Sequence, residues 1–207
     1  GRGGFRPVSR SRPRRHGPSA GGPPTRRPHD ARVATDGDEC LLEAREQGVD
    51  IEANIRNFVA QRAAFQRSGV SQNNRLIERH PSRNGFFWTS YDFAGNRDRQ
   101  NLFSFPLGPT GPNAFHHDGG ETIYSLPNGF QAYYLNTAKG DRLDKGPTAI
   151  VRDPSRKDFS VTNGISCMGC HDQGMRKAKD DVRELVLQGR AFPKDVRDAV
   201  EGLYPPH

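Results

Sequence analysis

The chain has 207 residues, enough for one domain or two small ones, and carries 31 Lys and Arg against 24 Asp and Glu. Hydrophobic residues make up only 32%, with 23 Gly and 16 Pro, so the composition excludes a chain that is globular from end to end. No apolar run is long enough for a transmembrane helix, and three cysteines are too few for a disulfide scaffold.

The first 38 residues differ in composition from the rest. They hold nine Arg, no Lys and three Asp, together with seven Gly and six Pro. Such a segment buries too little apolar surface to offset the entropy of ordering, so we expect residues 1–38 to form a disordered tail. Arginine binds phosphate, but Phe5 is the one aromatic residue here for base stacking, so nucleic-acid binding is disfavoured. The chain begins with Gly and shows no signal-peptide pattern, which predicts a fragment or processed product.

Residues 39–207 are expected to form the functional domain and to begin with helices. Asp50 has the side chain of an N-cap, and apolar residues recur near helical spacing from 51 to 66. Ser68 and Gly69 are typical of the end of a helix. Residues 69–120 are rich in Asn, Arg, Gly and Pro with scattered aromatic residues, so long loops are expected there.

The spacing of apolar residues changes at Glu121, and the new spacing predicts β-structure. Two short runs, 122–126 and 130–136, flank a Pro-Asn-Gly turn, and 148–151 is a third candidate strand. Further on, apolar spacing predicts one helix over 176–187 and a last helix with Pro193 in its first turn. The predicted fold class is α+β, with helices at both ends of the domain, a small antiparallel β-meander and long loops.

The string Cys167-Met168-Gly169-Cys170-His171 has the Cys-x-x-Cys-His spacing of c-type haem attachment. Two thiols one helical turn apart can add to the two vinyl groups on one edge of a porphyrin. The histidine that follows can present an imidazole nitrogen to the iron. We therefore predict one covalently bound haem (heme c), with thioethers at Cys167 and Cys170 and with His171 as the proximal iron ligand.

Other chemistries can use the same residues. A zinc site would add Cys40 and a histidine to Cys167 and Cys170, but the chain lacks a second paired knuckle. A thiol–disulfide redox motif would follow a strand of a βαβ unit, and no such pattern precedes the cysteines. Two structural cysteines without a ligand are a further possibility. The alternative function is a zinc-stabilised binding module with a basic N-terminal arm.

Six strings beyond residue 49 carry a family resemblance: SGVSQNNRLIERH (68–80), YDFAG (91–95), HDGGE (117–121), LPNGFQAYYL (126–135), DKGPTAIVRDP (144–154) and NGISCMGCHDQGM (163–175). They resemble a module of bacterial monohaem c-type cytochrome proteins, often part of longer periplasmic chains. The resemblance implies covalent haem, electron transfer with an unidentified redox partner protein, and a periplasmic location. It implies no substrate, and peroxidase-like activity would require an open sixth position on the iron.

The ligand on the distal side of the iron is sought among the remaining histidines and methionines. Met168 lies between the two cysteines, on the attachment edge, and is a poor candidate. His117 is preferred, because the two glycines after Asp118 let the backbone approach a flat ligand and an acid can fix an imidazole tautomer. The further candidates, in order of preference, are His116, Met175 and His80. Arginines between 75 and 99 are candidates to pair the haem carboxylates.

Overall fold

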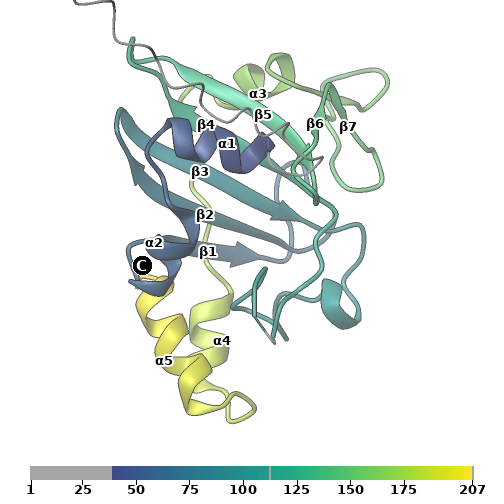
Figure 1. Cartoon of the computed structure of the whole chain (residues 1–207). Coiled ribbons are helices and arrows are strands. Elements are labelled where there is room, and N and C mark those ends of the chain that lie inside the picture. The colour runs from purple at the N-terminus through teal and green to yellow at the C-terminus, as the bar shows by residue number, and fades with distance from the viewer. Residues whose placement is uncertain (1–38, 112, 207) are drawn as a thin grey trace, which may run out of the picture. The chain divides into compact units, whose positions relative to one another are not determined.

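A computed structural model describes residues 39–111 and 113–206 of the chain. Six strands form one antiparallel sheet in chain order: β1 (Gln61–Phe65), β2 (Arg75–Ser82), β3 (Gly85–Asp92), β4 (Gly119–Ser125), β5 (Gln131–Thr137) and β6 (Arg142–Leu143). Each strand pairs with its neighbour in the sequence, so the sheet is a meander (Figure 1). A separate pair is formed by β7 (Lys145–Gly146) and β8 (Val161–Thr162).

The helices are short: α1 (Glu39–Glu46), α2 (Ile51–Arg56), the 3₁₀ turn η1 (Asp98–Gln100), α3 (Ile165–Cys170), α4 (Val182–Gln188) and α5 (Lys194–Leu203). In α5 the buried residues recur at helical spacing: Val196, Val200 and Leu203. This stripe packs with α4 in the main core (Figure 1). In the described ranges, no helix combines the length and apolar character needed to cross a membrane.

Alternation along the strands gives the sheet two faces. The face that we call the helix-covered face carries Arg62, Glu78 and Tyr91, and the main core on it includes α4 and α5. On the same face, Tyr124 donates a 2.8 Å hydrogen bond to Glu43 of α1. The opposite face, which we call the motif face, presents the next residues along the strands, listed here: Phe65, Arg75, Ile77, Glu121 and Tyr133. The segment with α3 lies over this motif face, as Tyr133 lies beside His171 with ring centroids 6.4 Å apart.

The predicted α+β arrangement, with helices at both ends of a small meander, is wrong. The meander starts at Gln61 rather than near Glu121, and it dominates the described domain. The helix predicted over 51–66 stops at Arg56. Asn57 caps it, Phe58 takes a positive φ of 55°, and the chain then enters β1. A six-residue helix is stabilised by packing and capping, so apolar spacing alone overestimated its length.

The segment predicted as loops, 69–120, contains β2 and β3. On β2 the residues that point to the helix-covered face are Leu76, Glu78 and His80, all fully buried. Two of these three are polar, so the strand lacks the apolar alternation that marks a half-buried strand in a sequence. The sequence pattern therefore did not predict this part of the sheet, because buried charged residues replace the apolar ones.

Several local predictions agree with the structure. The strands β4 and β5 flank the turn at residues 127–129, and Pro193 is the N-cap residue of α5. The run 148–151 instead forms a turn with one isolated bridge between Ser71 and Val151. The helix predicted over 176–187 begins only at Val182. The predicted tail, residues 1–38, lies outside the described residues.

Candidate cofactor site

The Cys-x-x-Cys-His motif lies at the C-terminal half of α3. Cys167 and Cys170 are on the helix, and His171 is its C-cap. Both cysteines are free thiols; Cys167 is buried and Cys170 is partly exposed. The structure therefore brings together, within one turn, the three residues that the sequence assigned to haem attachment.

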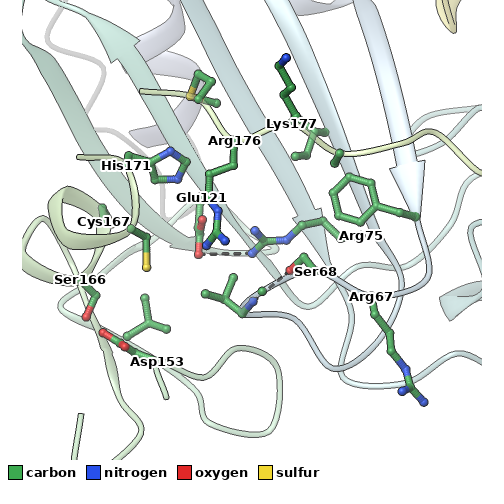
Figure 2. A pocket seen from close by; sticks show the side chains of 18 of the residues that line it. Arg67, Ser68, Arg75, Glu121, Asp153, Ser166, Cys167, His171, Arg176 and Lys177 are labelled. Carbon is green, nitrogen blue, oxygen red and sulfur yellow. Dashed lines mark hydrogen bonds and ion pairs between the residues drawn. The ribbon is translucent and has the colours of Figure 1, made fainter. Parts of the chain in front are cut away.

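Two cavities adjoin this motif. The first has a volume of about 440 Å³ and is lined by all three motif residues, Cys167, Cys170 and His171. Figure 2 shows Cys167 and His171 on one side of this cavity and Arg75 on the other. The second has a volume of about 530 Å³ and shares lining residues with the first, including Cys170 and Met175. Both volumes fall in the range of about 300–1,000 Å³ that is usual for ligand pockets.

The imidazole of His171 is fixed by the turn that follows α3. Its Nδ1 donates to the carbonyl oxygen of Gly174 at 3.2 Å, and the Gly174 N–H donates to the His171 carbonyl oxygen at 2.9 Å. Gly174 has a φ of 90°, which a residue with a Cβ rarely adopts. A proton held on Nδ1 leaves the lone pair on Nε2. This is the arrangement by which metal-ligating histidines are oriented.

The surroundings of the two thiols keep them protonated. Burial, followed by the negative charge of Glu121, raises the pKa of Cys167 to about 11. Burial, followed by the charge of Asp153, also raises the pKa of Cys170. A thiol–disulfide oxidoreductase instead needs a lowered pKa at its attacking cysteine. The environment of α3 therefore opposes the thiol–disulfide alternative.

The structure gives the zinc alternative no support. Within residues 39–111 and 113–206, no three His, Cys, Asp or Glu side chains are grouped so that they could hold a metal ion. A structural zinc site needs four such ligands. The side chain of Cys40, which the zinc prediction used, lies outside the described residues.

The cavity beside α3 has an apolar portion within a lining that is otherwise largely charged and polar. The wall of the first cavity includes Phe65, Val70, Ile77 and Val161. A Cβ atom built on Gly169, in the middle of the motif, would meet no atom within 4 Å. A c-type haem requires two free thiols, a histidine nitrogen for the iron and apolar side chains, and each of these borders the cavity among the described residues. The described residues therefore fit this group.

His117, the preferred distal ligand, lies elsewhere. It lines a third cavity with Val49 and Ile51, and its ring packs edge-on against Tyr91 with centroids 5.1 Å apart. Tyr91 belongs to the helix-covered face, so the sheet lies between His117 and the motif. Burial, which outweighs the nearby charge of Asp118, lowers the pKa of His117 to about 4. The structure does not bring His117 to the motif, and its role as an iron ligand stays a prediction.

The other distal candidates also differ in position. His80 is fully buried, with Nε2 2.7 Å from Glu78 Oε1 and Nδ1 3.2 Å from Asn54 Nδ2, so both ring nitrogens are occupied. His116 is exposed and lines neither motif cavity. Met175 lines both of these cavities. Of the four candidates for the distal position, Met175 is the one that the fold places beside the motif.

The sequence analysis missed most of the charged residues at the first cavity. Of the arginines between 75 and 99, only Arg75 lines it, and there Arg75 pairs with Asp92 and Glu121. Four further cations contribute to the lining: Arg67, Arg176, Lys177 and Lys179. A signal for three of them was available, because the string Arg-Lys-Ala-Lys begins five residues after the motif histidine and contains no acid.

Comparisons with known proteins add no identification. The chain matches no protein-family model, no curated protein and no solved structure. The resemblance to monohaem c-type cytochrome proteins therefore stays a prediction that rests on the strings in the sequence.

Proposed function

We propose that this chain is a monohaem c-type cytochrome domain that transfers electrons. In this proposal one haem is attached through Cys167 and Cys170, and His171 ligates its iron. The observation that carries the proposal is the geometry of α3, where two free thiols border a cavity next to a histidine oriented by the Gly174 carbonyl. The group itself would supply the one-electron redox chemistry.

The cysteines can complete the attachment without any further reagent. Cys167 and Cys170 would hold the group by thioether bonds, with the sulfur and hydrogen of each thiol added across one vinyl group, so that the attachment would need no oxidant and would release no leaving group. The raised pKa of both thiols supports this use, because a protonated thiol is less reactive in disulfide formation than a thiolate. The two cysteines can therefore remain reduced until attachment occurs.

The residues around His171 prepare it to bind a metal. The hydrogen bond from Nδ1 to the Gly174 carbonyl fixes the tautomer and leaves the lone pair on Nε2. The buried side chains of Phe65 and Val161 form part of the apolar wall of the cavity. The proposal also includes attachment on the outer side of a bacterial inner membrane and an unidentified redox partner protein.

Haem staining of a denaturing gel tests the proposal, because only a thioether-linked haem survives denaturation. Protein matured in a host that can attach c-type haem should stain, and the double variant Cys167→Ser, Cys170→Ser should not. Cys40→Ser is the matched control, since it removes a thiol outside the motif and should still stain. A wild-type protein that stays colourless after such maturation would overturn the proposal.

A further inference from the structure

The third cavity lies on the helix-covered face of the sheet. Its volume is about 550 Å³, within the range of about 300–1,000 Å³ that is usual for ligand pockets. The strands β3 and β5 contribute Thr89, Tyr91 and Asn136 to its lining. No residue of the Cys-x-x-Cys-His motif lines it. The cavity is therefore distinct from the proposed haem site.

His117 presents an imidazole to this cavity. The ring packs edge-on against two aromatic rings, with centroids 5.1 Å from Tyr91 and 6.0 Å from Phe115. Neither ring nitrogen makes a hydrogen bond with a described residue. Burial lowers the pKa of His117 to about 4, so at pH 7 the neutral ring offers one N–H donor and one acceptor nitrogen. A ligand in the cavity can therefore exchange hydrogen bonds with this ring.

Thr89 and Asn136 bring further polar groups to the cavity, and strand alternation places both side chains on the helix-covered face. Thr89 is 5% exposed, and its hydroxyl makes no hydrogen bond with a described residue. The Asn136 amide nitrogen donates to the Thr137 carbonyl oxygen at 2.9 Å, but its Oδ1 is buried without a partner among the described residues. Because buried polar groups are nearly always hydrogen-bonded, unpaired groups around one cavity favour a bound ligand.

The rest of the lining favours a ligand with an uncharged, largely apolar body. Its apolar part comes from the ring of Tyr91 and from four smaller side chains: Ala44, Val49, Ile51 and Pro109. Its ionisable groups other than His117 are two exposed cations and two exposed acids: Arg45, Lys139, Asp50 and Glu52. Their charges balance, so they give no net attraction to an ion of either sign.

We propose that the third cavity binds an uncharged aromatic molecule that carries a hydroxyl group, held by hydrogen bonds to Thr89 and His117. A phenolic hydroxyl suits these partners because it donates one hydrogen bond and accepts another. The ring of such a ligand lies among apolar side chains beside Tyr91, and contact between aromatic rings contributes beyond the area that is buried. This binding site goes beyond the proposed function and does not depend on haem attachment.

Isothermal titration calorimetry of the full chain tests the inference with four probes. Naphthol supplies the ring and the hydroxyl, its methyl ether lacks the donor, decahydronaphthol lacks the aromatic ring, and naphthoate carries a negative charge at pH 7. We expect naphthol to bind about tenfold more tightly than the ether and about threefold more tightly than decahydronaphthol. Naphthoate should bind about tenfold more weakly than naphthol, because a buried charge without a counter-charge is unfavourable.

Three variants then locate the binding. Thr89→Val removes the hydroxyl and keeps the shape of the side chain, so it should reduce the preference for naphthol over the ether to about threefold. His117→Phe keeps a ring beside Tyr91 and should have a similar effect. Thr162→Val is the matched control, because Thr162 is a strand residue whose hydroxyl also lacks a described partner but which does not line the cavity. It should keep the tenfold preference.

Circular dichroism establishes that each variant is folded, and Thr89→Val decides the test if His117→Phe does not fold. Equal binding of naphthol and its ether, tighter binding of naphthoate, or an unchanged preference in Thr89→Val would overturn the inference. A preference lost in Thr162→Val would also overturn it, because the ligand would then bind elsewhere.

These outcomes are distinct from failure of the proposed function. A chain that never acquires covalent haem but shows the expected preference supports the inference and refutes only the proposed function. Protein that carries covalent haem should bind naphthol with the same preference. Loss of naphthol binding on haem attachment would overturn the inference, because the ligand would then compete with haem for the motif cavity.

Discussion

The two sides of the sheet differ in how far the polar groups around them are paired within the described part of the chain. On the helix-covered face, Arg62 Nε donates to Glu78 Oε2 at 2.6 Å, and Nη1 donates to the Leu107 carbonyl at 3.1 Å. Glu78 also receives hydrogen bonds from His80 and Tyr91. On the motif face Arg75 pairs with Asp92 and Glu121, but four cations at the cavity beside α3 make no ion pair with any described residue.

This difference separates groups that stabilise the fold from groups that can bind a ligand. Burial opposes ionisation of Glu78, but the Arg62 charge and the hydrogen bond from His80 outweigh it and hold the pKa of Glu78 below its usual range. Beside α3, by contrast, four cations have no ion pair with any described residue, and they are available to something outside the chain.

The largest expected effect comes from the helix-covered face. Glu78→Ala leaves Arg62 buried without its counter-charge and should lower the free energy of unfolding by about 3–5 kcal/mol. Denaturant unfolding monitored by circular dichroism measures this loss. Glu52→Ala, which removes an exposed partner of Arg56, is the control and should change stability little. A comparable loss of unfolding free energy in both variants would mean that the buried ion pair stabilises the fold no more than the exposed one.

A smaller effect is a pH dependence of the free energy of unfolding that is caused by protonation of His117. The folded protein binds a proton at His117 only below about pH 4, whereas an unfolded chain binds it near pH 6.5. Between these values the unfolded state binds more protons, so stability falls as the pH is lowered, in total by roughly 2–3 kcal/mol.

The variant His117→Gln should remove most of this fall in stability between the two pH values. Its exposed neighbour provides the control, since His116→Gln should keep the wild-type pH dependence. Denaturant unfolding at the two ends of the interval measures both. A full loss retained in His117→Gln would show that another group titrates there.

A substitution in the turn after α3 should lower the free energy of unfolding by about 1 kcal/mol and should also change the haem absorption spectrum. Gly174→Ala forces a side chain into a φ of 90° and should displace the carbonyl that orients His171. Gly129→Ala, at a φ of 83° in the turn between β4 and β5, carries the same backbone cost and is the control. Both variants should lose stability, but only Gly174→Ala should alter the haem absorption spectrum. Identical spectra would argue against the role of the Gly174 carbonyl.

The smallest effect on stability, but a clear spectroscopic one, is expected at the distal position. Because Met175 lines both motif cavities and His117 lies across the sheet, Met175→Leu should change the ferric haem spectrum and His117→Gln should not. The reverse pattern would restore His117 as the distal ligand and require the cavity assignment to be abandoned.

The sequence predicted the local placement of the motif better than the fold around it. The motif is local, so its spacing alone places Cys167, Cys170 and His171 in one helical turn. The strands β1 and β2 were missed because their inward positions include Arg62, Glu78 and His80, which read as surface residues until their partners are known. Arg176 lies five residues after the motif histidine, and the fold places it in the lining of both motif cavities.

Mass spectrometry of the matured protein tests the central claim most directly. Proteolysis should yield one peptide that contains both Cys167 and Cys170 and carries the mass of a single haem bound through two thioethers. The same peptide should be unmodified in the double cysteine variant. A motif peptide without haem, isolated from a host that attaches haem to another c-type cytochrome in parallel, would contradict the account.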